Sequence, residues 1–218
     1  MKLNVDDAVR YMGAGKGNAE IREMTAEIAE ELEKAVKPRF TWRTFHIEMQ
    51  EGGVLFREAG EILPGKLAVN MLQECETAVL MVCTLGAEFD AMQRAWSARD
   101  MARAVVLDAC GSALVEAGCD AAEEELAGRF PGMYRTDRFS SGYGDIPLET
   151  QDWILRAVDA GRRLGVTVTA SCLMIPSKSV TAVIGLSDKP QGAKIRGCAY
   201  CTLREECAYR KRGTVCGA

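Results

Sequence analysis

The sequence has little of what several classes of protein require. It contains one histidine, His46, and its 27 lysines and arginines are outnumbered by 31 aspartates and glutamates, which gives a formal net charge of −4. This balance leaves no excess of positive charge with which to bind nucleic acid. The first residues lack the apolar core of a signal peptide, and no stretch approaches the roughly 20 apolar residues of a membrane span. We therefore expect a cytoplasmic protein whose partners are neither nucleic acids nor membranes.

Cysteine, in contrast, is plentiful, with nine residues among 218. Because no secretory signal is recognised, a disulfide framework is not expected, and a cluster of cysteines is better explained by metal binding. Four of the cysteines lie in apolar segments, and these are Cys75, Cys83, Cys110 and Cys119. We predict that they are small buried hydrophobic residues rather than ligands.

The last part of the chain is rich in cysteine and arginine, and it contains a different set of thiols. Cys198 and Cys201 form a C-x-x-C start, and Cys207 and Cys216 follow. Two thiolates at that spacing can hold one metal centre, and two more complete a tetrahedral set. Zinc and an iron–sulfur cluster fit four thiolates about equally, and unligated surface cysteines are the alternative. We predict a metal-binding tail at residues 191–218.

The pattern of apolar residues and turn residues predicts an α+β domain over residues 1–190. The segments with helical periodicity are 5–12, 18–37, 66–72, 101–127 and 148–164, and a further helix that contains Phe89, Met92 and Trp96 begins at Thr84-Leu85-Gly86. Asp100 is a candidate cap for the helix 101–127. Strand-like segments lie within 40–63 and at 78–83, and a hairpin is predicted from 166–171 and 180–185. Helices and strands do not alternate strictly, which favours an α+β fold over a doubly wound parallel sheet.

The longest irregular segment, 129–148, contains the first candidate site. Arg138 can grip a carboxylate with two parallel hydrogen bonds. Gly142 and Gly144 permit backbone conformations that bring N–H and C=O groups against a ligand. Tyr143 between them offers a flat face to a cation or to a large planar ring. A purely structural loop is the alternative.

The second candidate is Glu116, which lies among Ala, Leu and Val in the long helix 101–127. A carboxylate at such a position either points to solvent or faces a cationic partner, because burying it unpaired is costly. Both interpretations stay open on the residues alone.

These segments, taken together, resemble a known family. Arg138, Gly142 and Tyr143 match the R-x-x-x-G-Y motif in the activation domain of cobalamin-dependent methionine synthase, in its short, free-standing form. Further segments follow in the family's order: Thr84-Leu85-Gly86, Leu114-Val115-Glu116-Ala117, Asp145-x-Pro147-Leu148-Glu149-x-Gln151 and Met174-Ile175-Pro176-Ser177-Lys178-Ser179-Val180. The resemblance covers residues 5 to 186, and we therefore expect no homocysteine or folate domain of the kind found in the full-length enzyme.

The resemblance implies a fold and a set of binding residues. The fold would be a twisted antiparallel sheet with flanking helices, curved around a ligand groove. Arg138 would hold the carboxylate of S-adenosylmethionine, and Glu116 would hold its amino group or the surroundings of that group. Tyr143 would lie near the sulfonium and the corrin, with Gly142 and Gly144 lining the ligand with backbone.

The resemblance also implies a function, which is reductive reactivation of a cobalamin-binding methionine synthase or a related corrinoid protein. Inactive cob(II)alamin on that partner is reduced by one electron, and the resulting cob(I)alamin takes the methyl group of S-adenosylmethionine. The chain would be an accessory subunit of a methyltransferase that positions the methyl group without a catalytic residue of its own. No general base is needed, which agrees with the scarcity of histidine.

The Cys-rich tail is a departure from the classical multidomain enzyme, whose activation domain lacks it. We hypothesise that the tail holds an iron–sulfur cluster that passes the reducing electron from a donor, and a structural zinc is the alternative. A second function hypothesis is a small metal or iron–sulfur redox or interaction module that binds no S-adenosylmethionine. An ordinary S-adenosylmethionine methyltransferase is disfavoured, because the strand–glycine loop–helix unit of a nucleotide site is missing near the N-terminus.

Overall fold

The computed structural model describes residues 1–13, 19–192, 195, 205 and 211 of the chain. The helices in this part of the chain are α1 (Val5–Tyr11), α2 (Ala19–Ala35), α3 (Lys66–Leu72), α4 (Gly86–Ser97), α5 (Met101–Arg129), α6 (Thr150–Ala157) and α7 (Ala160–Leu164). The strands are β1 (Arg39–Gln50), β2 (Gly53–Phe56), β3 (Glu61–Pro64), β4 (Thr77–Thr84), β5 (Tyr134–Arg135), β6 (Thr167–Val168), β7 (Met174–Ile175) and β8 (Ser179–Ser187).

These elements form two compact units, which are described in turn. The first unit comprises Met1–Trp42, Met81–Phe130 and Gln151–Thr181. The second comprises Arg43–Leu80, Pro131–Thr150 and Ala182–Ala218.

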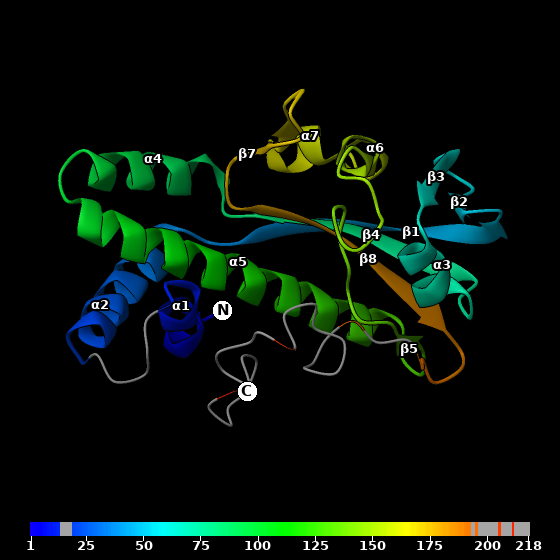
Figure 1. Ribbon diagram of the computed structural model, residues 1–218, viewed down its shortest axis with the longest axis horizontal. Coiled ribbons are helices and arrows are strands. Elements are labelled where there is room, and N and C mark those ends of the chain that lie inside the picture. Colours follow the sequence, from blue (N-terminus) through cyan, green and yellow to red (C-terminus); the bar gives the residue numbers. More distant parts are fainter. Residues whose placement is uncertain (14–18, 193–194, 196–204, 206–210, 212–218) are drawn as a thin grey trace. The chain divides into compact units, whose positions relative to one another are not determined.

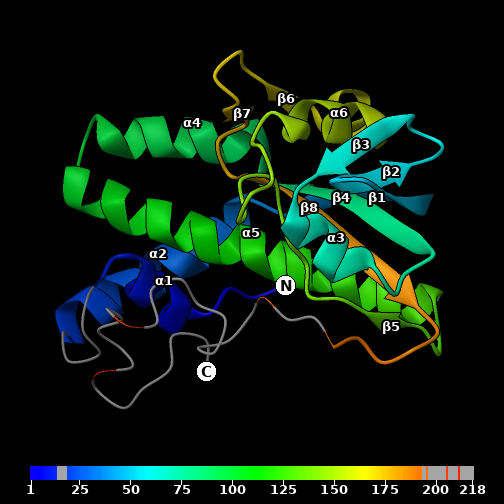
Figure 2. The same ribbon diagram turned by 45° about the vertical axis from the view of Figure 1, so that its right-hand side comes forward.

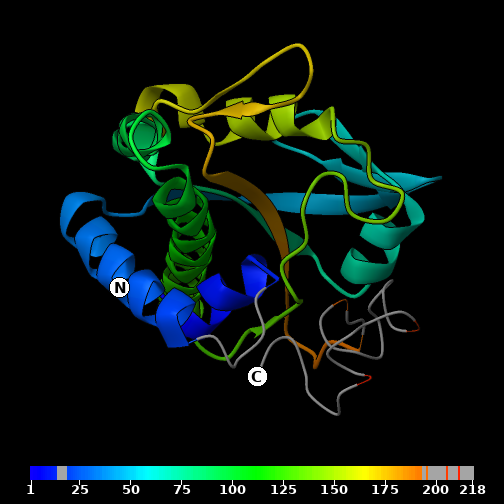
Figure 3. The ribbon, with the colours of Figure 1, turned by 60° about the vertical axis from the view of Figure 1, so that its left-hand side comes forward.

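The long helix α5 organises the first unit, where it contacts α1, α2 and α4 (Figures 1 and 3). Its start is capped by the Asp100 side chain, which accepts a hydrogen bond of 3.1 Å from the backbone N–H of Arg103. Glycines in α5 permit close packing. A Cβ at Gly111 would lie 2.4 Å from the Phe89 ring of α4, and one at Gly118 would lie 2.7 Å from Cys83 Sγ. The small residues of α5 therefore set how closely its neighbours approach.

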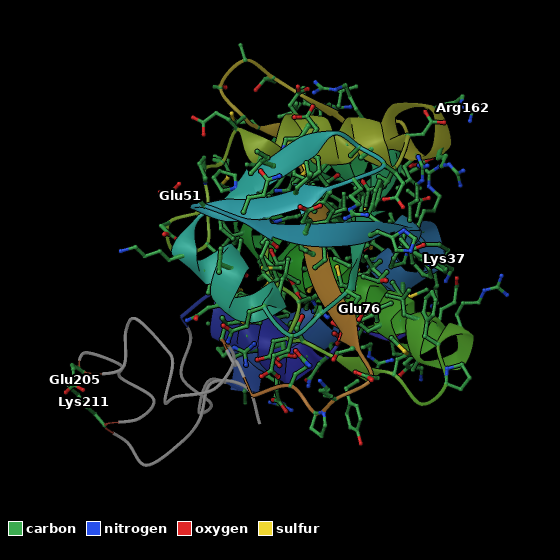
Figure 4. The ribbon with its side chains drawn as sticks, turned by 90° about the vertical axis from the view of Figure 1, so that its right-hand side faces the viewer. Lys37, Glu51, Glu76, Arg162, Glu205 and Lys211 are labelled. Atoms are coloured by element: carbon green, nitrogen blue, oxygen red, sulfur yellow. The ribbon has the colours of Figure 1, made fainter. Side chains whose placement is uncertain are left out.

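A six-stranded antiparallel sheet has the strand order β3-β2-β1-β4-β8-β5. In the second unit, β1 and β2 pair with Ile47 opposite Phe56, and the exposed Glu51 lies in the turn between them (Figure 4). Phe45 and Phe56 are buried edge to face, with ring centroids 6.0 Å apart. The α+β class and the twisted antiparallel sheet with flanking helices are thus confirmed.

The helix α3 packs against β2 and β3 in the second unit (Figure 2). Its buried side chains are Ala68, Met71 and Leu72, while Lys66 and Leu67 lie at its start. Its bounds agree with the helix that the sequence predicts at 66–72. This helix is the support on which a candidate binding loop rests, as shown below.

The predicted hairpin of 166–171 with 180–185 is wrong. In the structure β6 pairs with β7, and β8 joins the large sheet between β4 and β5. A tight turn closes the chain early, because Cys172 adopts a φ of 60° and donates its N–H to the carbonyl of Thr169. Pro176 then has no N–H with which to continue the ladder. The predicted helix 148–164 is likewise two helices, because Asp159 between them has a φ of 56°.

The four cysteines expected in the core are buried, as predicted: Cys75, Cys83, Cys110 and Cys119. Burial, followed by the charge of Glu74, raises the pKa of Cys75 to about 11. Burial raises the pKa of Cys110 to about 12. Both thiols are therefore protonated at neutral pH, which makes them poor metal ligands.

None of the helices in the described ranges is long and apolar enough to cross a membrane. The predicted tail, 191–218, lies almost wholly outside the described residues, so the predicted boundary at residue 190 stays a prediction.

Candidate functional site

The candidate loop, Arg138–Ile146, starts from an anchored backbone in the second unit. Phe139 is fully buried and exchanges two backbone hydrogen bonds with Val183 of β8, of 3.1 and 2.8 Å. Just before it, Thr136 donates its N–H to the carbonyl of Gly185 at 3.1 Å, and its hydroxyl accepts from the N–H of Gly185 at 2.9 Å. The base of the loop is thereby fixed to the sheet.

Arg138 lies at this base, and only 8% of its surface is exposed. A guanidinium is rarely buried to this extent unless it is paired, and Arg138 does have an interaction partner. The residue is therefore held in the protein rather than extended into solvent. Its backbone lies between two residues, Thr136 and Phe139, that are hydrogen-bonded to β8.

The tip of the loop is a compact turn that contains the predicted glycine–tyrosine residues. Gly142 and Gly144 have φ values of 83° and 56°, in the left-handed region that favours glycine. Gly142 donates its N–H to the carbonyl of Ile146 at 3.0 Å, and Ile146 donates to the carbonyl of Tyr143 at 3.0 Å. Tyr143 is 51% exposed, whereas Ile146 is buried. The turn therefore exposes the Tyr143 side chain, while the N–H groups of Gly142 and Ile146 form hydrogen bonds within the loop.

Two side-chain contacts that the sequence did not predict hold this loop in place. The Ser141 and Thr150 hydroxyls share a hydrogen bond of 2.6 Å, and Thr150 also donates to the carbonyl of Pro147 at 2.7 Å. The Asp145 carboxylate accepts hydrogen bonds from the start of α3, which lowers its pKa. The sequence offers one hint of such a contact. Gly65, just before the predicted helix, has no side chain that could cap it, so an acceptor has to come from elsewhere.

Glu116 lies in α5 of the first unit and is half-buried, next to the buried Val115. Its carboxylate is close to the phenol of Tyr11 in α1. Partial burial of Tyr11 and, after it, the charge of Glu116 raise the pKa of that phenol. The charge of Glu116 therefore acts on Tyr11. Arg138, Gly142, Tyr143 and Gly144 are brought together in one loop, and Glu116 belongs to the other unit.

Two further segments of the family resemblance meet in the first unit. The Ser179 hydroxyl donates to Thr84 Oγ1 at 2.8 Å, and Leu85 donates its N–H to the carbonyl of Lys178 at 2.9 Å. Thr84 Oγ1 also accepts from the N–H of Gly86 at 3.1 Å. We call Thr84, Ser179 and the Gly86 N–H the buried hydroxyl junction. It satisfies buried polar groups, and its evident role is to join β4 to the start of β8.

The side chains beside this junction are also paired. Ser177 donates its hydroxyl to Asp90 at 2.5 Å. Lys178 forms an ion pair with Asp108 at 2.9 Å and donates to the Ser112 hydroxyl at 2.9 Å. These contacts attach the segment after β7 to α4 and α5.

Among the residues that the structure describes, no group of three or more His, Cys, Asp or Glu side chains is arranged to hold a metal ion. The four predicted metal ligands, Cys198, Cys201, Cys207 and Cys216, lie outside those residues. The tail site therefore stays a prediction.

Comparison with known proteins gives a structural match. No protein-family model matches the sequence, and no curated protein sequence matches it either. The chain is similar to a crystal structure of the MetH reactivation domain bound to AdoHcy, with a TM-score of 0.62 and 16% sequence identity. The match covers 95% of this chain and 77% of that one. At this identity the comparison establishes architecture, and the chain has the fold of the MetH reactivation domain.

Proposed function

We propose that this chain binds S-adenosylmethionine and reactivates a cobalamin-dependent methionine synthase or a related corrinoid protein. The observation that carries the proposal is the Arg138–Ile146 loop, in which a buried arginine stands at the base and Tyr143 at the tip. The shared fold supports it, because the structural neighbour was crystallised with AdoHcy. AdoHcy is what remains of S-adenosylmethionine once the methyl group has been transferred.

The loop fits the chemistry of this ligand. A guanidinium has five N–H donors, so Arg138 can keep an internal partner and still bind a ligand carboxylate through two parallel hydrogen bonds. The exposed ring of Tyr143 offers a π face to a sulfonium cation. Gly142 and Gly144 are exposed and carry no side chain that would keep a ligand from the backbone.

The chain's own task is to bind and orient. A corrinoid bound to the partner supplies the nucleophilic metal centre and accepts the methyl group. Arg138 fixes the amino-acid end of the ligand, while the Tyr143 turn limits where the sulfonium can lie. Holding two reactants in line converts an encounter into a near-unimolecular step, and it needs no general base from the protein.

Glu116 remains our proposed contact for the ligand's amino group. Its carboxylate is half-buried in α5, and a carboxylate is suited to bind an ammonium group. Glu116→Gln removes the charge and keeps the shape. We expect it to weaken binding of S-adenosylmethionine and to leave the fold intact.

For the tail we propose that Cys198, Cys201, Cys207 and Cys216 hold an iron–sulfur cluster or zinc. Four thiolates can bind either one. Metal analysis and an anaerobic visible spectrum of fresh protein distinguish the two. Colourless protein with one zinc would remove the electron-transfer role of the tail and leave the binding role of the loop untouched.

Calorimetry with S-adenosylmethionine tests the binding proposal directly. We expect Arg138→Ala to weaken binding about ten- to a hundredfold, because a charged hydrogen-bonded contact contributes about 1.5–3 kcal/mol. Arg57→Ala is the matched control, since Arg57 lies in the same unit and pairs with Glu48 on an exposed hairpin. Equal binding by the wild type and Arg138→Ala would contradict the site.

Reconstitution tests the activity. The protein is mixed with a partner loaded with cob(II)alamin, a reductant and S-adenosylmethionine labelled at the methyl group. Transfer of label to the partner is expected only when all components are present. If the protein binds a metal but neither binds S-adenosylmethionine nor supports transfer, it is instead the redox or interaction module.

A further inference from the structure

The helix α3 begins without a capping side chain of its own. Its N-cap position is Gly65, which has a φ of 118° and no side chain. The first N–H groups of a helix have no partner within it and need an acceptor from elsewhere. In this protein the acceptor comes from a residue far away in the sequence.

That acceptor is Asp145, the residue that follows the Gly142–Tyr143–Gly144 turn. Its Oδ2 accepts a hydrogen bond of 2.7 Å from the N–H of Lys66, and its Oδ1 accepts one of 3.0 Å from the N–H of Leu67. Hydrogen bonds to an ionised carboxylate are shorter and stronger than neutral ones. The same two bonds hold the pKa of Asp145 below its usual range, so the group is charged at neutral pH.

Close packing accompanies these bonds, with the loop running beside α3 (Figure 2). A Cβ at Gly65 would lie 2.9 Å from Asp145 Oδ1, and a Cβ at Gly144 would lie 3.1 Å from Leu67 Cδ2. Each glycine thus permits an approach that a larger residue would obstruct. Because α3 is itself anchored by buried side chains, it is a firm support for the loop.

We propose that Asp145 is a positioning residue, whose carboxylate clamps the Tyr143 turn to the start of α3 so that the turn is ordered before a ligand arrives. We call this contact the loop clamp, comprising Asp145 and the N–H groups of Lys66 and Leu67. The ligand consequence rests on the proposed function, whereas the ordering of the loop does not. The resemblance to the methionine synthase family assigns Asp145 no role.

The loop clamp is connected to the Tyr143 turn by one residue and one backbone hydrogen bond. Ile146, the next residue, donates its N–H to the carbonyl of Tyr143, so a movement of Asp145 also moves the turn. Small displacements of a positioned group cost binding and rate disproportionately. Loss of the carboxylate is expected to weaken S-adenosylmethionine binding about tenfold. Asp145→Asn keeps one acceptor oxygen, so its effect lies between those of the wild type and Asp145→Ala.

The test combines two measurements on the full chain. Amide hydrogen exchange reports on the ligand-free loop, and calorimetry reports on S-adenosylmethionine. In Asp145→Ala we expect faster exchange at Lys66 and Leu67, where the bonds are lost, and also at Gly142 and Ile146, within the turn. Asp100→Ala is the matched control, because Asp100 caps α5 in the other unit. It is expected to leave both the turn and the affinity unchanged.

The two proposals fail in different ways. If the wild type does not bind S-adenosylmethionine, the proposed function fails, and exchange at Gly142 and Ile146 still tests the clamp. If Asp145→Ala speeds exchange at Lys66 and Leu67 but leaves the turn and the affinity unchanged, Asp145 is only a helix cap and the inference is overturned. If Asp145→Ala and Asp100→Ala weaken binding equally, the effect is one of general stability, which also overturns it.

Discussion

The buried hydroxyl junction and the loop clamp both tie together segments that are far apart in the sequence, but they do so in different surroundings. Thr84 is fully buried and Ser179 is 9% exposed, and their hydroxyls meet each other and a backbone N–H. Asp145, in contrast, is exposed, and its charge meets two backbone N–H groups. A lost bond in the core leaves a polar group without water, whereas a lost bond at the surface is replaced by water. The junction should therefore govern stability, and the clamp should govern the position of the loop.

Thr84→Val is the change with the largest expected effect on stability. Valine has nearly the same shape but leaves the Gly86 N–H without its acceptor in the core. We expect the free energy of unfolding to fall by about 1–3 kcal/mol. Urea denaturation measures it. Thr25→Val is the control, since that hydroxyl donates to a carbonyl of its own helix and its removal leaves no N–H unpaired. Equal losses for the two variants would contradict the role of the junction.

Gly144→Ala comes next, and it tests the loop side of the comparison. Alanine at a φ of 56° is strained, and its Cβ would press on Leu67. We expect a loss of about 1–2 kcal/mol in the free energy of unfolding. The matched control is Gly132→Ala, at a φ of 81° with open space around it. Both variants should be destabilised, but only Gly144→Ala should also weaken S-adenosylmethionine binding. The comparison breaks down if Gly132→Ala weakens binding as well.

Lys178→Met probes the ion pair next to the hydroxyl junction. Asp108, its partner, is 57% exposed, so water screens the pair. We expect a loss of about 0.5–1 kcal/mol in the free energy of unfolding, smaller at high salt. Lys34→Met, which removes an exposed pair with Glu30, should have no measurable effect. A loss for Lys178→Met as large as that for Thr84→Val would show that the ion pair is not screened.

The smallest expected effect is the pH dependence of the clamp. The pKa of Asp145 is lowered in the folded protein, so its carboxylate stabilises the fold above the unfolded-state value of 3.8. That contribution disappears as the pH falls through the lower folded-state pKa. The stability difference between the wild type and Asp145→Asn should therefore be constant at neutral pH and vanish in acid. Thermal unfolding across this range measures it, and a difference that persists in acid would argue against a charged clamp.

The two aspartate caps show what sequence reasoning could reach. Asp100 caps α5 through a residue three positions away, and the sequence predicted both the cap and the helix that follows. Asp145 caps α3 although it lies 79 residues from Lys66 in the sequence, and the sequence assigned it no role. Both caps are aspartate carboxylates that accept from backbone N–H groups, but only Asp100 lies within one helical turn of the N–H that it caps.

The strands show the same limit. The segment at 78–83 was predicted from its apolar run, and β4 occupies it. The predicted pairing of 166–171 with 180–185 was wrong. It assumed that two successive apolar segments pair with each other, whereas the turn at Cys172 brings β7 next to β6 first. Strand existence follows from local composition, whereas strand partners depend on turns and on the rest of the sheet.

The sequence by itself determined the mixed α+β composition, the span of α3, the capped start of α5 and the concentration of Arg138, Gly142, Tyr143 and Gly144 in one segment. Each of these follows from forces that act within a few residues, such as helical periodicity, capping and the conformational freedom of glycine. Only the tertiary structure decided that Asp145 holds α3, that Ser179 meets Thr84 and that Arg138 is buried. Those outcomes depend on which distant groups the fold brings within hydrogen-bond distance of one another, and a linear pattern of residues does not encode that locally.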